Sequence, residues 1–104
     1  LSMQDDPKVQ QIVDELVKNY QPEKIIMFGS RVTGKTHEWS DVDLIAIKKT
    51  DKKFRDRIRE ASSSFRHVLP VDVIVYTPEE FEQMSKENRF VREEILGKGQ
   101  VIYG

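Results

Sequence analysis

Two adjacent groups of residues have the types and spacing needed for phosphate chemistry. Residues 29–36 read G-S-R-V-T-G-K-T after the apolar run 25–28, and residues 40–44 read S-D-V-D-L. The first group matches the P-loop pattern G-x-x-x-x-G-K-[ST], which holds nucleotide phosphates. The second group carries two aspartates one residue apart, and oxygen ligands of this kind suit a divalent cation. The two patterns therefore predict different reactions: loss of the γ-phosphate, or metal-dependent transfer of a nucleotide.

The P-loop interpretation needs a strand, a glycine-rich loop and then a helix whose N-terminus points at the phosphates. After Lys35-Thr36, only residues 37–40 precede Asp41 and the next apolar run. A crossover between parallel strands normally needs about a dozen residues or more. A Walker-B aspartate is also hard to place, because Asp72 stands at the start of its apolar run. These observations disfavour the P-loop.

The aspartate pair supports the other interpretation. Side chains alternate along a strand, so Asp41 and Asp43 should share one face while Val42 points to the other. Asp72, in Val71–Val75, is a third acid in an otherwise apolar run. Burying it unpaired would be costly; a metal, or an exposed position on the face of the first two, removes that cost. Three carboxylates could hold two Mg²⁺ ions about 3.5–4 Å apart, which activate an attacking oxygen and stabilise departing pyrophosphate.

The Gly29-Ser30 turn suits the phosphates of the same site. Glycine lets the backbone approach a phosphate closely. Ser30 would add a hydroxyl and an N–H at the start of a short helix, which is an anion site. Arg31 and Lys35 are near enough in sequence to contact phosphates, or could simply be solvated. Taken alone, Ser40-Asp41 could be an ordinary turn.

The elements that must position these residues alternate between helix and strand. The acids and the proline at residues 5–7 predict a helix start. Residues 29–41 are turn-rich, with room for one short helix, and the spacing around them does not decide whether the flanking strands run parallel. Helices are expected over 6–19, about 51–66 and 79–96, the last open to a break near Asn88; strands are expected over 24–28, 42–47, 71–76 and, at the edge, 100–103. This order predicts one domain, residues 1–104, with helices packed against a small sheet.

Composition excludes several classes of function. Seventeen basic and eighteen acidic residues nearly cancel, so nucleic acid is not expected as the primary partner. The chain has no cysteine, which excludes disulfides and thiolate sites and fits a cytoplasmic location. We see no membrane-length apolar run and no signal-peptide pattern. The basic residues of 52–59 are expected to form the solvated face of a helix.

Together, the G-S-x-x-x-G and S-D-x-D-L motifs and the acid in Val71-Asp72-Val73 resemble the nucleotidyltransferase motif of the DNA polymerase β superfamily. The chain most resembles its minimal branch of small stand-alone domains, over nearly its whole length, including the closing run 95–103. This resemblance implies an α+β nucleotidyltransferase fold with a small mixed sheet flanked by helices. It also implies Asp41, Asp43 and Asp72 as catalytic Mg²⁺ ligands. Gly29 and Ser30 would hold the triphosphate, with Arg31 and Ser40 as further nucleotide-binding candidates.

The same resemblance implies a reaction and a partner. The expected enzyme takes ATP with Mg²⁺ and passes AMP to an acceptor hydroxyl. Minimal members of the family commonly work with a helical partner of the HEPN type, and several such pairs are toxin and antitoxin. The acceptor is therefore expected on a partner protein. Two alternatives stay open: a module that neutralises its partner by contact without turnover, and the disfavoured P-loop NTPase.

Overall fold

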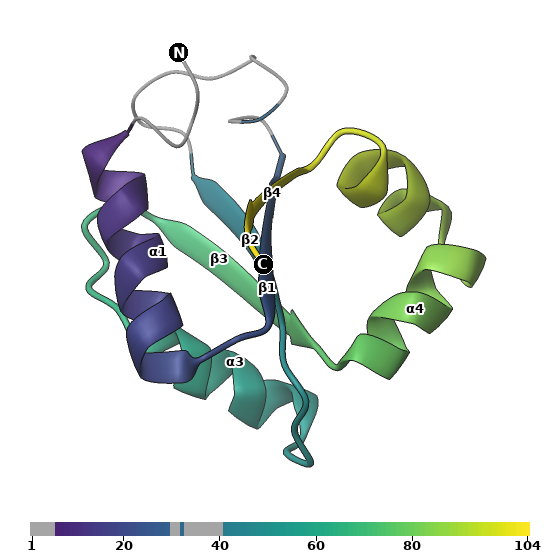
Figure 1. Ribbon diagram of the computed structural model, residues 1–104, viewed down its shortest axis with the longest axis horizontal. Helices are drawn as coiled ribbons and strands as arrows, with labels where there is room; N and C mark the ends of the chain where they lie inside the picture. The colour runs from purple at the N-terminus through teal and green to yellow at the C-terminus, as the bar shows by residue number, and fades with distance from the viewer. Residues whose placement is uncertain (1–5, 30–31, 33–40) are drawn as a thin grey trace.

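The chain folds as a four-stranded sheet between two layers of helices (Figure 1). The computed structural model describes residues 6–29, 32 and 41–104. The short helix expected within 29–41 therefore falls largely outside the described residues. The elements in chain order are α1 (Pro7–Tyr20), β1 (Lys24–Phe28), β2 (Val42–Ile47), α3 (Phe54–Ser62), β3 (Val71–Tyr76), α4 (Pro78–Glu87), the π-helix η2 (Val91–Leu96) and β4 (Gln100–Tyr103).

The sheet has the strand order β3-β2-β1-β4 and is mixed, as expected. β2 runs antiparallel to β1 and parallel to β3, while β4 runs antiparallel to β1 at the other edge. The direction that the spacing left open is thus antiparallel. This pairing contradicts the P-loop alternative, because a P-loop strand leads through its helix into a parallel crossover. It also brings the end of β1 and the start of β2 to the same edge of the sheet.

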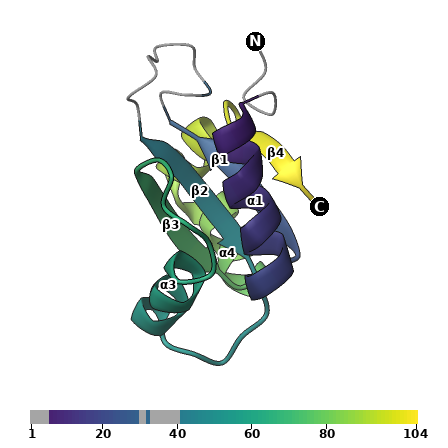
Figure 2. The same ribbon diagram turned by 90° about the vertical axis from the view of Figure 1, so that its left-hand side faces the viewer.

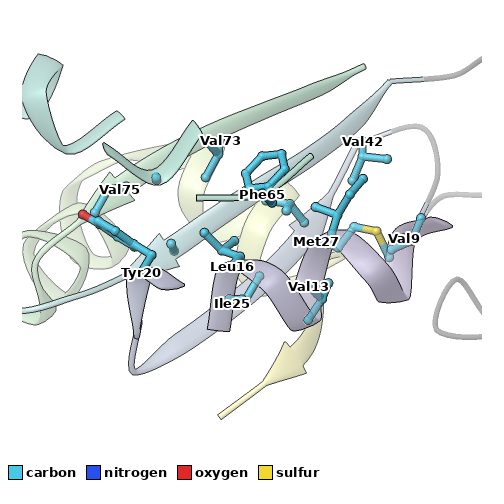
Figure 3. Close-up of a cluster of buried hydrophobic side chains, with 14 residues drawn as sticks. Val9, Val13, Leu16, Tyr20, Ile25, Met27, Val42, Phe65, Val73 and Val75 are labelled. Atoms are coloured by element: carbon cyan, nitrogen blue, oxygen red, sulfur yellow. The ribbon is translucent and has the colours of Figure 1, made fainter. Parts of the chain in front are cut away.

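One face of the sheet packs against α1 and α3 (Figures 1 and 2). The apolar residues of α1 recur at helical spacing, and Ile12 and Leu16 are fully buried. Figure 3 shows Leu16 beside strand residues such as Ile25, Met27 and Val73, which belong to the same buried cluster. Full burial of one such side chain contributes about 1.5–3 kcal/mol. The cluster on this face is the larger of the two buried clusters in the described residues.

The opposite face packs against α4 and η2 through a smaller cluster. Ile26, Ile45 and Ile47 from the strands meet Val91 and Ile95 of η2. β2 is therefore covered on both faces, which explains why its sequence is almost continuously apolar rather than alternating. Asp43 is the exception within that strand.

The ends of the helices follow local sequence signals. The Asp6 carboxylate caps α1 by accepting a hydrogen bond from Lys8 N at 2.9 Å. The predicted helix over 79–96 is divided at Asn88, whose Oδ1 accepts from Val91 N at 3.1 Å. The helix predicted over 51–66 is shorter in the structure, where α3 spans Phe54–Ser62. Phe65 reaches the core from beyond the end of α3. No helix in the described part of the chain is both long and apolar enough to cross a membrane.

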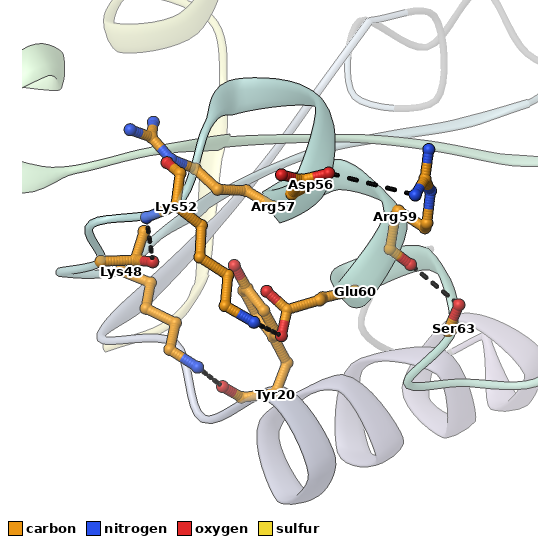
Figure 4. Close-up of polar contacts among 9 residues, drawn as sticks. Tyr20, Lys48, Lys52, Asp56, Arg57, Arg59, Glu60 and Ser63 are labelled. Atoms are coloured by element: carbon orange, nitrogen blue, oxygen red, sulfur yellow. Dashed lines mark hydrogen bonds and ion pairs between the residues drawn. The ribbon is translucent and has the colours of Figure 1, made fainter.

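The basic residues of α3 correct one expectation. Arg57 is buried, with 7% of its surface exposed, rather than solvated. Its guanidinium donates to both carboxylate oxygens of Glu80 on α4, at 2.6 and 3.3 Å, and its Nε donates to Lys52 O at 2.7 Å. Nearby, Lys48 donates to the backbone oxygen of Tyr20, linking the end of β2 to α1 (Figure 4). These contacts tie the two helical layers to the same end of the sheet.

Candidate functional site

The three aspartates singled out by the sequence meet at one edge of the sheet. Phe28 ends β1, Asp43 lies near the start of β2, and Asp72 lies near the start of β3. The register pairs Phe28 with Asp43 and Asp43 with Asp72. These three residues therefore stand side by side on consecutive strands. Asp41 directly precedes Val42, the first residue of β2, so it lies at the same edge of the sheet.

Register also decides which face these side chains share. Residues paired across neighbouring strands point to the same side of a sheet, and so do residues two apart along one strand. Asp43 is therefore on the same face as Ile45, and Asp72 is on the same face as Ile74. Both isoleucines pack on the side of the sheet that faces α4 and η2. The carboxylates therefore lie on the same face of the sheet as that apolar cluster, beyond the part that α4 and η2 cover. Asp72 is exposed and Asp43 is half-buried, so the acid within the apolar run of β3 carries little burial cost.

The position of Gly29 beside Asp43 requires a residue without a side chain. Its φ of 85° lies in the left-handed region that side chains other than glycine rarely adopt. A Cβ at this position would overlap Asp43 Oδ2 and come within 3.2 Å of Asp43 Cγ. The backbone after β1 can therefore turn tightly against the carboxylate only because residue 29 has no side chain.

The electrostatics of the site centre on Asp43. Partial burial raises the pKa of Asp43, and the negative charges of Asp72 and Asp41 raise it further. Both effects disfavour the ionised carboxylate. A bound cation would oppose both effects on the pKa of Asp43, because it supplies positive charge. Among the described residues at this edge, no positive group lies within hydrogen-bonding distance of the carboxylates.

The other residues predicted for the site lie outside the described residues. These are Ser30, Arg31 and Ser40, together with Lys35 of the rejected P-loop. Among the described residues, no three side chains of His, Cys, Asp or Glu lie close enough to form a complete metal site. The fold thus brings Asp41, Asp43 and Asp72 to one edge and one face, without closing their carboxylates around a single point.

Two aromatic residues beside the carboxylates were not singled out in the sequence. Phe28 lies opposite Asp43 and makes an edge-to-face contact with Phe90, with ring centroids 6.2 Å apart. Phe90 directly precedes η2 and is 54% exposed. The residues are far apart in the chain, so no local pattern could have joined them. Only the strand register and the packing of η2 do so.

Comparison with known proteins identifies the family of this chain. Residues 9–102 match the nucleotidyltransferase domain family. The chain is 35% identical over 83 residues to the probable protein adenylyltransferase MntA of Haemophilus influenzae, a match that covers 76% of this chain and 70% of MntA.

Two solved structures share the fold. A nucleotidyltransferase structure from Sulfolobus solfataricus superposes with a TM-score of 0.63 at 23% identity, over 89% of this chain and 74% of the other. A toxin-antitoxin structure with AMP-PNP superposes with a TM-score of 0.55 at 17% identity, over 89% and 71%. The motif, the sheet and the match across most of the sequence lead to one conclusion: this chain belongs to the nucleotidyltransferase domain family.

Proposed function

We propose that residues 1–104 act as one catalytic domain that transfers AMP from ATP, with Mg²⁺, to a hydroxyl group on a partner protein. The observation that carries this proposal is the meeting of Asp41, Asp43 and Asp72 at one edge of the sheet, next to the tight turn at Gly29. The family supports nucleotidyl transfer as the type of reaction. The choice of AMP and of a protein acceptor is supported by the name of the relative MntA.

The donor set fits magnesium. Aspartate oxygens are hard ligands, which Mg²⁺ prefers. The facing charges that raise the pKa of Asp43 are those that a divalent cation would stabilise. We infer that Asp41, Asp43 and Asp72 would be the ligands that hold two such ions. When bound, the metal would neutralise phosphate charge and lower the pKa of an attacking hydroxyl.

The chain's own residues would position the reactants. Gly29, which has no side chain, would let the backbone approach a phosphate closely, and Ser30 would donate from its hydroxyl and N–H groups, with Arg31 and Ser40 as further contacts. The acceptor oxygen attacks the α-phosphorus, and the bond from this phosphorus to the bridging oxygen of pyrophosphate breaks. Asp72 would receive the hydroxyl proton, because it is the most exposed carboxylate of the register pair. Pyrophosphate leaves with the electron pair of the broken bond.

The partner is proposed to be a helical protein of the HEPN type, with this chain as the antitoxin of the pair. The fold neighbour described as a toxin-antitoxin with AMP-PNP is consistent with such a role. The net charge of −1 also favours a protein acceptor over a polynucleotide, which would call for a basic surface.

A label-transfer assay tests this function. The protein is incubated with Mg²⁺, a helical protein of the HEPN type as the proposed partner, and ATP labelled at either the α- or the γ-phosphate. We expect label from the α position on the partner protein, and release of the γ-phosphate within pyrophosphate. Asp43→Asn and Asp72→Asn should each abolish transfer. Asp51→Asn is the matched control, because Asp51 is an exposed acid beyond the opposite end of β2.

Contact without turnover is the second candidate function, and the same variants separate the two. If the Asp43→Asn protein still neutralises its partner, contact rather than transfer is the mechanism. Absence of α-label on any macromolecule, with a partner that is nonetheless neutralised, would have the same meaning.

A further inference from the structure

Phe90 is the most exposed large apolar side chain in the described part of the chain, with 54% of its surface accessible. Its neighbour Val91 is buried at 2% exposure and anchors the start of η2 in the core. A single exposed apolar side chain is common on protein surfaces and does not by itself indicate a ligand. The position of Phe90 beside the carboxylates is what carries the inference.

Phe90 lies on the carboxylate face of the sheet. Its ring meets Phe28 at an interplanar angle of 85°, with centroids 6.2 Å apart. Phe28 is the register partner of Asp43, and Asp43 is the register partner of Asp72. Neighbouring strands are about 4.8 Å apart, so Phe28 continues the row of carboxylates by one strand, and Phe90 lies against Phe28. An apolar aromatic surface therefore adjoins the charged part of the site.

We propose that Phe90, in T-shaped contact with Phe28, is the platform on which the base of the nucleoside triphosphate stacks. This inference rests on the proposed function, since it assumes a nucleotide whose phosphates lie at Gly29 and the aspartates. The phosphates need cations and N–H donors, which aromatic rings do not supply. The base needs a π-face, and Phe90 offers one beside the carboxylates without blocking them.

Local contacts hold this platform in place. Asn88 Oδ1 caps the turn that carries Phe90 by accepting from Val91 N at 3.1 Å. Arg92 Nη1 donates to Lys86 O at 2.7 Å, which ties η2 back to the last turn of α4. The backbone on both sides of Phe90 is thus fixed, while its ring remains open. Binding of a base would therefore cost little conformational entropy in this segment, which favours affinity.

Stacking on one ring has a consequence for selectivity. Every base has a π-face, so stacking tolerates different bases and depends on the area of contact. Phe90 should therefore favour purine over pyrimidine nucleotides without separating ATP from GTP. Any preference between those two must come from hydrogen bonds made elsewhere.

Equilibrium binding with Mg²⁺ tests the platform directly. Dissociation constants are measured by calorimetry for ATP, GTP and inorganic tripolyphosphate, with the wild-type chain, Phe90→Ala and Phe90→Trp. Phe90→Ala should weaken ATP and GTP by about tenfold or more and leave tripolyphosphate unchanged. Phe90→Trp should bind ATP at least as well as the wild type. Phe54→Ala is the matched control: it removes another exposed phenylalanine, at 43%, whose ring packs on Tyr76 at the far end of β3.

Four results would overturn the inference. Unchanged ATP affinity in Phe90→Ala would exclude base stacking, and a loss of transfer at unchanged ATP affinity would assign the ring to the acceptor instead. An equal loss for tripolyphosphate would show a general disturbance of the site. Failure of the wild-type chain to bind Mg²⁺-ATP at all would reject the proposed function itself, and the inference with it.

Discussion

Asp43 lies directly opposite Asp72 in the parallel register of β2 and β3, on the same face of the sheet. Like charges that face each other across neighbouring strands are destabilising. The charge of Asp72 adds to partial burial in raising the pKa of Asp43. The pairing therefore weakens the metal-free protein at the point where the reaction is proposed to occur, a common cost of functional sites.

Asp43→Asn should stabilise the metal-free protein at neutral pH by about 0.2–1 kcal/mol. Because folding raises the pKa of Asp43, the native state binds its proton more tightly than the unfolded state does. The associated stability is present at pH below the ordinary aspartate pKa and is lost as pH rises through the native pKa. At pH 7 the repulsion is fully present, and the neutral amide removes it. Urea unfolding at pH 7 with a chelator measures the change.

The same pair of unfolding experiments with Mg²⁺ provides the internal check. Magnesium should stabilise the wild type by mass action and should stabilise Asp43→Asn much less. Asp51→Asn should behave like the wild type in both conditions. If the metal-free Asp43→Asn protein is less stable than the wild type, the facing charges are not a net cost.

Gly29→Ala should lower both stability and nucleotide binding. A left-handed φ at a residue with a side chain costs about 1–3 kcal/mol, and the new Cβ would also overlap Asp43 Oδ2. Thermal unfolding and ATP binding measure the two losses.

A double-mutant cycle with Asp43→Ala separates the two causes at Gly29. Removing the carboxylate relieves the overlap but not the strained φ, so the stability losses should be less than additive. Strictly additive losses of stability would mean that a side chain at position 29 has no steric interaction with Asp43.

Glu80→Gln should destabilise the fold without touching the reaction. Its carboxylate pairs with the guanidinium of Arg57, which is almost buried, and hydrogen bonds to a charged group contribute about 1.5–3 kcal/mol. Glu80 itself is 44% exposed on its side chain, so the lower end of that range is expected. Urea unfolding at pH 7 measures the loss, and ATP binding should stay unchanged.

The pH dependence of this ion pair has a defined sign. The hydrogen bond from Arg57 lowers the pKa of Glu80 below its ordinary value. The stabilisation is therefore present above the ordinary glutamate pKa and is lost as pH falls through the lowered value. Glu80→Gln should flatten that acid limb. Glu82→Gln, which alters an exposed pair with Lys86 on the same helix, should not.

Leu16→Ala should be the most damaging of these changes for stability. Leu16 is fully buried between α1 and the sheet, and truncation of such a residue costs about 2–5 kcal/mol. Val17→Ala on the adjoining, partly buried position should cost less. Equal losses at the two positions in urea unfolding would contradict the assigned face of α1.

The sequence by itself determined the elements and the candidate carboxylates. Helical spacing of apolar residues located α1, apolar runs bounded by turns located β1, β2 and β3, and the break at Asn88 had a visible polar cause. The motif at 29–44 with Asp72 was sufficient to indicate the family, because it combines a glycine turn with acids at strand starts. These features are local, so they can be read from neighbouring residues.

Only the tertiary structure decided how the elements meet. Strand direction depends on pairing across the whole sheet, and the antiparallel β1–β2 pair is what excluded the P-loop. The pairing of Asp43 with Asp72, the contact of Phe90 with Phe28 and the burial of Arg57 against Glu80 each join residues from separate elements. No local propensity encodes such contacts. They follow from the packing of two helical layers on one sheet, because that packing sets which side chains are covered and which remain open at its edge.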